Sequence, residues 1–429
     1  MRVLTKWFNK AVKNLLFFLA TFVSLNASTQ SLTLESAYQR AREQYPLTKQ
    51  KGLIKQTADL TIQNLSRGYW PQIVVYGQAT YQSSVTAVNI NNPAIKIEVP
   101  SKDQYKLFTD VSQVLYDGGE IKQQKTLQQL NATVEEGQIE VELYQLRQRI
   151  TQLYLGVMLL EEQMKQVELV KKDLQGGERT VEAQVANGLV LRSNLNVLKA
   201  EVLSTDQRLI ELKAARKGLI DVLGLFLNQD LPETTVFILP GNPAVSGSEI
   251  KRPELNLYNG QSNLFQQQKK LVDARNRPRT SAFVQGGYGR PVLNLFKNEF
   301  EPYFIVGLRM NWSLSDLYTA KREKKLYDVN QKSVDVQKEV FLLNTNMQLK
   351  QQAAEIMKWS QLIATDKEII ALRESVKEAA KAQLENRVIT ANDYLKEVNE
   401  EDSARQNLIL HEMQLLQAQI NYQIILGDQ

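Results

Sequence analysis

The sequence predicts a mainly α-helical protein with a smaller membrane β-barrel portion, built from two structural repeats. Three observations support this fold class. Proline is confined to two clusters, apolar residues outside those clusters recur with the period of long coiled-coil helices, and four short segments alternate polar with apolar residues. Each of the two structural repeats is therefore expected to combine a strand pair with long coiled-coil helices.

Two long stretches without proline are expected to form the long helices. No proline occurs in residues 101–231 or after Pro302, and proline breaks helix interiors. In the first stretch, apolar residues alternate steps of four and three, as in the a/d seam of a coiled coil. The later half is weaker, with Ile356, Ile363 and Ile370 recurring every seven residues. On this feature alone, an ordinary coiled coil would be the better interpretation. The first seam comprises Ile139, Leu143, Leu146, Ile150, Leu153, Val157, Leu160, Met164 and Val167.

A fixed offset relates the two halves of the chain. Pro46 and Pro71 are 25 residues apart, as are Pro253 and Pro278, so the offset between the pairs is 207. Equal spacing between such landmarks is the mark of an internal repeat.

The long helices repeat with a slightly smaller offset of 199. The span from Asp117 to Asn187 and the span from Asp316 to Asn386 are both 70 residues long. Each would form a helix of about 105 Å. In the first repeat, two shorter helical segments, at about 36–66 and 188–227, together match that length.

Four segments of about ten residues have the length of a strand that crosses a bilayer at a tilt. The clearest runs from Phe304 to Leu314, and aromatic residues gather near the strand ends, as in the girdles of membrane barrels. An ordinary antiparallel sheet would show the same alternation. Because four strands cannot close a membrane barrel, several chains would have to share one. The residues expected to face the barrel lumen are Gln78, Lys106, Asp110, Gln285, Arg309 and Asn311.

The N-terminus is expected to be a secretory signal peptide. Four basic residues precede the apolar run 15–23, and small polar residues follow it. Removal of this segment lowers the formal net charge from +5 to about +1, so the basic balance gives no reason to expect a nucleic-acid partner. The chain has no cysteine and hence no disulfide, and we find no later apolar stretch of about 18 residues that could form a transmembrane helix. The export signal without a helical anchor favours the membrane interpretation of the strands.

These observations divide the chain into four parts. Residues 1–29 are the signal peptide, 30–231 the first repeat, 232–252 a linker or equatorial segment, and 253–429 the second repeat. Each repeat should contain a helix, two strands, a long helix and a return helix. The strands are expected at about 73–82 and 105–116, and at about 281–289 and 303–314.

Five short segments follow one another along the chain: LTLESA at 32–37, YP at 45–46, YWP at 69–71, LYDGG at 115–119 and NGLV at 187–190. By the order of these segments and by its duplication, the chain resembles the TolC-type outer-membrane efflux proteins, the outer membrane factor family, over essentially its whole mature length. The resemblance implies a homotrimer in which three chains of four strands form one 12-stranded barrel, continued by an α-helical tunnel through the periplasm. It implies a passive channel of a tripartite efflux or type I secretion system, with outer-membrane lipid around it and no cofactor. Its partners would be a periplasmic adaptor (a membrane fusion protein) and an inner-membrane pump of the RND or ABC type, and its cargo small toxic compounds or proteins.

The resemblance also assigns the periplasmic gate and the adaptor contact to the two helix-to-helix tips. An acidic gate residue of the family falls on Asp393, and its first-repeat counterpart falls on Asn194. Three copies of Asp393 near an axis would repel one another and favour cations, although Asn392 and Asp393 also suit a helix N-cap. The tip residues singled out are Asn187, Gly188, Leu189, Asn194, Asn386, Ile389 and Asp393.

In some members of that family a Tyr and an Arg on the second tip lock the gate. The matching positions here are Leu384 and Ile389, so the lock is missing or built differently.

The sequence offers no catalytic constellation. His411 is the only histidine, and Gly176-Gly177 lacks the surrounding pattern of a phosphate-binding loop. The pair Glu400-Glu401 is interpreted as part of a solvated helix face. We therefore expect no enzyme and no metal site. Two other classes remain open: an exported structural or adhesive coiled-coil protein without a channel, and a periplasmic adaptor, which would normally carry β-domains on both sides of a single hairpin.

Overall fold

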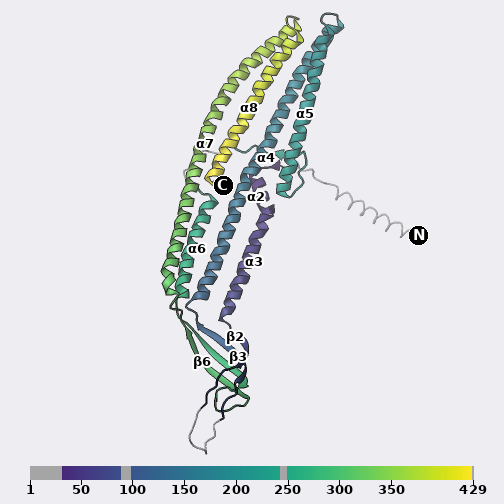
Figure 1. Cartoon of the computed structure of the whole chain (residues 1–429). Helices are drawn as coiled ribbons and strands as arrows, with labels where there is room; N and C mark the ends of the chain where they lie inside the picture. The colour runs from purple at the N-terminus through teal and green to yellow at the C-terminus, as the bar shows by residue number, and fades with distance from the viewer. Residues whose placement is uncertain (1–30, 88–97, 242–248, 428–429) are drawn as a thin grey trace, which may run out of the picture. The chain divides into compact units, whose positions relative to one another are not determined.

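The computed structural model describes residues 31–87, 98–241 and 249–427. The expected signal peptide lies outside these ranges, as does part of the expected linker. Most of the described chain is helical, with one four-stranded sheet and one short strand pair (Figure 1). Within the described residues, no helix is both long and apolar enough to cross a membrane.

The chain forms two compact units, and each takes segments from both sequence repeats. The first unit comprises residues up to Tyr45, 145–250 and 348–429, and the second comprises 46–144 and 251–347. The two long helices, α4 (Glu120–Ala186) and α7 (Leu317–Glu385), contribute residues to both units.

The first unit contains α2 (Leu34–Gln44), α5 (Arg192–Leu227), α8 (Ala391–Leu426) and the second parts of α4 and α7. A two-residue parallel pair, β1 (Ser31–Leu32) with β4 (Val236–Phe237), was not expected from the sequence. Tyr154 of α4 is fully buried beside this pair, and its hydroxyl lies 2.6 Å from the Leu32 carbonyl oxygen and 2.7 Å from that of Ile238. Burial raises the pKa of Tyr154 to about 12, so this hydroxyl stays protonated and able to donate.

The second unit contains α3 (Leu47–Ser66), the short 3₁₀ helix η1 (Arg67–Tyr69), α6 (Pro253–Arg275) and the first parts of α4 and α7. Where one helical segment was expected at 36–66, the structure has a break at Tyr45. The reason is Pro46, because the residue before a proline is driven out of the helical region, and Tyr45 is extended with ψ 129°.

The sheet of the second unit has the strand order β2-β3-β5-β6, and all its neighbours are antiparallel. β6 ends three residues before the end expected from the sequence. Its last residue pairs with Arg279, the first residue of β5, and the preceding Pro278 cannot extend the ladder because it has no N–H. The strands span Gln72–Tyr81 (β2), Asp103–Tyr116 (β3), Arg279–Arg290 (β5) and Glu301–Asn311 (β6).

A carboxylate and two glycines form the turn that leads into α4. The Asp117 side chain accepts hydrogen bonds from the backbone N–H groups of Gly119 and Ile121, both at 2.8 Å. Gly118 and Gly119 have φ values of 72° and 85°, a backbone region that other residues adopt at a cost. These three residues turn the chain from β3 into α4, which explains the LYDGG segment in physical terms.

The coiled-coil seam of α4 packs inside the protein. Six of its nine residues are buried and the other three, Leu153, Leu160 and Met164, are half-buried. In α7 only Ile363 and Ile370 of the expected positions are buried. The weaker periodicity of the second half thus corresponds to a helix that leaves more of its apolar residues uncovered within one chain.

Candidate functional site: a two-faced sheet and paired hairpin tips

The strand register sorts the sheet into a polar and an apolar face. Residues that pair directly across antiparallel strands point to the same side. Gln78 pairs with Lys106, and Asp110 pairs with Gln285. Followed across all four strands, the register puts the six residues expected to face a lumen on one side of the sheet: Gln78, Lys106, Asp110, Gln285, Arg309 and Asn311.

The opposite face is apolar and exposed along its length. Phe304, for example, is 74 % exposed. A continuous apolar surface of this kind marks contact with lipid or with another protein. Its large exposed members are Ile73, Val75, Leu107, Val284, Phe304, Val306, Leu308 and Met310.

Aromatic residues lie at both ends of this apolar face. Tyr81, Tyr105 and Tyr288 are exposed near the strand ends that join the long loops. Near the other strand ends, which join the helices, lie the exposed Trp70 and Trp312. This is the girdle arrangement of membrane-spanning sheets.

The polar face carries one ion pair and several aromatic rings. Arg309 Nη2 lies 3.3 Å from Asp110 Oδ2, and its guanidinium carbon lies 4.5 Å from the centroid of the Phe283 ring. Gly287 makes room for another ring, that of Phe108, because a Cβ at position 287 would lie 2.5 Å from the Phe108 Cβ. This face therefore combines charged, polar and aromatic side chains.

The outer strands β2 and β6 each have one neighbour within the described sheet, which is not closed. The second unit also leaves apolar helix residues uncovered. Leu53 and Leu60 of α3 are exposed and seven residues apart, and α7 has a longer exposed stripe at coiled-coil spacing. That stripe comprises Val329, Val336, Val340, Leu343 and Met347.

In the first unit, α4 and α5 meet at a tip that ends in a glycine cap. Gly188 has φ 70°, its N–H bonds to the carbonyl of Val185 at 2.9 Å, and the N–H of Leu189 bonds to that of Gln184 at 2.9 Å. These two hydrogen bonds form a Schellman motif. The Asn187 side chain donates to the Ala183 carbonyl at 2.8 Å. Leu189 is half exposed, whereas Asn194 is half-buried in the first turn of α5.

The tip between α7 and α8 has the same turn with an arginine in the glycine position. Arg387 has φ 64°, and Val388 bonds to the Gln383 carbonyl at 2.8 Å. The Asn386 side chain donates to Ala382 at 2.8 Å, as Asn187 does to Ala183. The two tips therefore repeat one another in backbone geometry, but the second includes a left-handed residue with a side chain.

Asp393 takes part in a capping box at the start of α8. Its carboxylate accepts hydrogen bonds from the Thr390 hydroxyl at 2.7 Å and the Thr390 N–H at 3.0 Å. The N-cap is thus Thr390, and neither Asn392 nor Asp393 takes that position. Hydrogen bonds from the side chain and then the backbone of Thr390 lower the pKa of Asp393 below its ordinary value of 3.8. The exposed carboxylate is therefore ionised at neutral pH.

The two tips share one hydrophobic cluster. Leu384, at the position of the family's lock tyrosine, is buried in it, and Ile389 packs against it. Tyr394 is buried against Gly177, where an added Cβ would lie 2.9 Å from its ring. Burial raises the pKa of Tyr394 to about 12. Both positions that suggested a missing lock are therefore occupied by apolar packing.

Near these tips, a buried lysine links three helices. Lys377 Nζ of α7 lies 2.8 Å from Asp173 Oδ2 of α4 and 3.1 Å from Glu401 Oε2 of α8. Arg405 also bonds to Glu401, whose side chain is only 4 % exposed. The expectation that Glu400-Glu401 forms a solvated face is thus wrong for Glu401, because it lies in the apolar seam of α8.

The neighbouring residue on α8 extends this network to the other hairpin. Asp402 Oδ2 accepts a hydrogen bond from Arg208 of α5 at 2.8 Å, and its Oδ1 accepts one from Gln166 of α4 at 3.2 Å. Glu401 and Asp402 together connect all four helices of the paired hairpins. We call Asp173, Lys377, Glu401, Asp402 and Arg208 the ion network.

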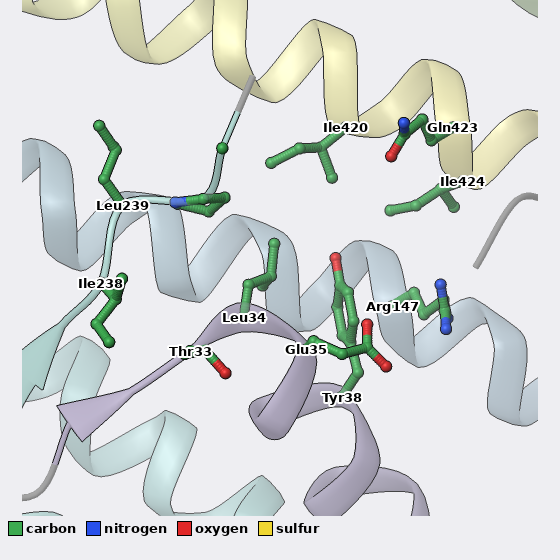
Figure 2. A pocket seen from close by; sticks show the side chains of 12 residues that line it. Thr33, Leu34, Glu35, Tyr38, Arg147, Ile238, Leu239, Ile420, Gln423 and Ile424 are labelled. Atoms are coloured by element: carbon green, nitrogen blue, oxygen red, sulfur yellow. The ribbon is translucent and has the colours of Figure 1, made fainter. Parts of the chain in front are cut away.

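A pocket of about 410 Å³ opens beside β1 and β4 (Figure 2). Ile420 and Ile424 of α8 face Leu34 and Tyr38 of α2 across it, and the Arg147 guanidinium lies 5.0 Å from the Tyr38 ring. The residues lining it contain no nucleophile paired with a base. Among the described residues, no group of three or more His, Asp or Glu side chains is placed to hold a metal ion. His411 instead lies 2.6 Å from the carboxylate of Asp366.

No family profile and no curated protein sequence matches this chain significantly. Its structure does match solved structures. It is similar to CusC, whose crystal structures describe conformational changes that accompany folding and transmembrane channel formation. The TM-score is 0.67, with 14 % identity over 95 % of this chain and 96 % of that one. It is similar to the outer membrane protein VceC from Vibrio cholerae, with a TM-score of 0.65 and 12 % identity over 92 % and 96 %. The Campylobacter jejuni CmeC outer membrane channel matches with a TM-score of 0.63 and 13 % identity over 92 % and 85 %.

The chain therefore has the fold of the outer membrane factor channels. The TolC-type resemblance inferred from its sequence is confirmed at the level of the fold.

Proposed function

We propose that the chain is the outer-membrane channel of a tripartite efflux or type I secretion system. The observation that carries this proposal is the two-faced sheet, with an exposed apolar face bounded by aromatic residues and a polar face behind it. A soluble coiled-coil protein has no need of such a sheet. In a passive duct, the apolar face contacts lipid and the polar face lines the passage.

In this proposal three copies complete one barrel. The free edges of β2 and β6 cannot remain open in lipid, and an antiparallel β6-to-β2 pairing between copies continues the strand alternation of the sheet. The exposed stripes of α3 and α7 support the same head-to-tail contact, because they offer apolar seams next in sequence to those strands. Three chains give the 12-stranded barrel of the family, with the helices forming its periplasmic tunnel.

The hairpin tips are the proposed gate and the contact with a periplasmic adaptor. The exposed Leu189 of the first tip and Asp393 of the second suit a surface that another protein covers. Asp393 would present a ring of three carboxylates in the trimer. The ion network takes the place of the family's tyrosine and arginine lock, because it ties α7 and α8 to the other hairpin. An inner-membrane pump would supply the cargo, small toxic compounds or proteins.

The division into two sequence repeats joined by the segment 232–252 is part of the same proposal. The first 29 residues act as the export signal, and the mature chain is placed in the outer membrane and periplasm.

Disulfide cross-linking between copies tests the proposed closure. The chain has no cysteine, so Val75→Cys on β2 can be combined with Phe304→Cys, Val306→Cys or Leu308→Cys on β6, all on the apolar face. We expect one combination to give covalent ladders that stop at three chains. The pair Leu107→Cys with Val306→Cys is the control, because β5 separates these strands within a chain. The proposal fails if no β2–β6 combination links, or if the purified chain is a monomer in detergent.

A further inference from the structure

The loop between β5 and β6 is unusually apolar for an exposed loop. It covers residues 291–300, and Leu293 and Phe296 are 61 % and 55 % exposed. Leu295 and Phe300 are also exposed. Loops at a protein surface are normally polar, so four large apolar side chains uncovered in ten residues require a partner.

Several polar groups of this loop bond within it, to the first residue of β6 or to Ser101 just before β3. The Asn298 side chain accepts from the Ser101 N–H at 3.0 Å and donates to the Ser101 hydroxyl at 2.8 Å. Asn294 accepts from the N–H of Phe296 at 3.1 Å, and Lys297 pairs with Glu301. The loop is thus held in a defined shape that leaves its apolar side chains outside.

The loop continues the apolar face of the sheet. The Phe300 ring stacks on that of Tyr288 with centroids 5.7 Å apart, and lies 6.3 Å from that of Tyr105. Tyr288 and Tyr105 belong to the apolar face by strand register. Arg290 lies over the Phe300 ring at 5.2 Å and pairs with Asp103. A band of aromatic rings with one paired cation, next to exposed leucines, is the composition of a membrane–water interface.

We infer that this loop is an interfacial anchor, with Leu293, Leu295 and Phe296 inserted among the acyl chains of the lipid leaflet that surrounds the loop end of the sheet. This inference rests on the proposed membrane function, because it requires the apolar face to contact lipid. It adds that the lipid contact extends beyond the strands. The loop then fixes the depth of the strands in the bilayer instead of serving the passage.

Spin-label accessibility tests the inference on the full chain in lipid vesicles. The cysteine-free chain allows one nitroxide at Phe296→Cys, and separately at Leu293→Cys as a second variant. Oxygen concentrates in the hydrocarbon, whereas a water-soluble nickel chelate stays in the aqueous phase. Labels at Leu107→Cys and Gln285→Cys, on the apolar and polar faces of central strands, are the matched references.

We expect both loop labels to collide with oxygen more often than with nickel, as the Leu107→Cys label should. A nickel-accessible loop, like the Gln285→Cys label, would show that the loop projects into water and overturn the inference. Low collision rates with both reagents would place the loop against a neighbouring copy and overturn it equally. If the Leu107→Cys label itself reports water, the proposed function fails as well, so the two failures are distinguishable.

Discussion

Removing the buried ammonium of the ion network should loosen the paired hairpins. In Lys377→Met the side chain keeps its length and apolar stem but loses its hydrogen bonds to Asp173 and Glu401. Glu401, only 4 % exposed, then lacks one of its two cationic partners. An ionised carboxylate in that position is costly because it cannot recover water.

The free energy lost in Lys377→Met depends on the environments of Asp173 and Glu401. Removing one partner of a fully buried ion pair costs about 3–5 kcal/mol. Here Asp173 is 42 % exposed and can rehydrate, and Glu401 retains its bond to Arg405. We therefore expect a loss of about 2 kcal/mol, which is an increase of about thirtyfold in local opening.

Hydrogen exchange of the α8 amides around Glu401 measures this opening, because exchange there reports local unfolding. We expect exchange in Lys377→Met to rise by the factor above. Lys381→Met, an exposed lysine one turn further along α7, is the control and should leave it unchanged. The double variant Lys377→Met/Glu401→Gln should recover part of the loss. Exchange equal to that of the control variant, or fully additive losses in the double variant, would refute this reasoning.

Further predictions concern backbone and charge at the hairpins. Gly176→Ala should stabilise α4 by about 0.5–1 kcal/mol, whereas Gly177→Ala should destabilise it by about 1–3 kcal/mol because the added Cβ meets the Tyr394 ring; thermal unfolding of both variants checks the contrast. Arg387→Gly should raise stability by about 1 kcal/mol in the same assay, since glycine relieves the left-handed backbone. The folded pKa of Asp393 is lowered, so its contribution is present above the unfolded pKa and is lost as pH falls through the folded one. The stability difference between the native chain and Asp393→Asn should therefore shrink below pH 3.8, and a pH-independent difference would contradict this.

The stability that the ion network contributes should depend on pH through Lys377. Burial lowers the pKa of Lys377, but hydrogen bonds to Asp173 and Glu401 outweigh it and the net pKa is raised above 10.5. A raised lysine pKa contributes stability below the unfolded pKa, and this is lost as pH rises through the folded value. The protection factors of the amides around Glu401, which compare each exchange rate with the base-catalysed rate of an unfolded chain at the same pH, should thus persist through neutral pH and decline only in alkali above 10.5. A decline between pH 7 and 9 would assign the protection to another group.

Periodicity was sufficient to predict most elements, because each long helix and each strand repeats its pattern over many residues. The pair of β1 with β4 was not predictable in this way. Two residues on each side show no period, and the pair is held by the distant hydroxyl of Tyr154. The two faces of the sheet followed from alternation, and its open edges followed from the small number of strands.

Glu401 was expected to be solvated because it is charged, although its spacing along α8 indicates a buried position. Ala391, Tyr394 and Val398 are buried at steps of three and four, and the next step of three reaches Glu401. The spacing therefore signalled a core position, and the expectation of a solvated face ignored it. One of its two cationic partners, Lys377, lies on another helix, and the periodicity of a single helix does not indicate which residue of a neighbouring helix it contacts.

The turns between α4 and α5 and between α7 and α8 contain Asn187 and Asn386, the two residues that the repeat aligns, but the chemistry of these turns depends on contacts between elements. Asn187 and Asn386 make the same side-chain bond in the two tips. Leu384 and Ile389 are core residues of a shared cluster, which the comparison of lock positions could not reveal.

Single-channel recording in planar bilayers tests the central claim most directly. The purified, detergent-stable oligomer of the full mature chain should insert and open discrete ionic conductances. Asp393→Ala should retain the pore and reduce its preference for cations, because a ring of carboxylates favours them. If heat-stable oligomers of both the native chain and Asp393→Ala insert without conducting, the chain forms no duct.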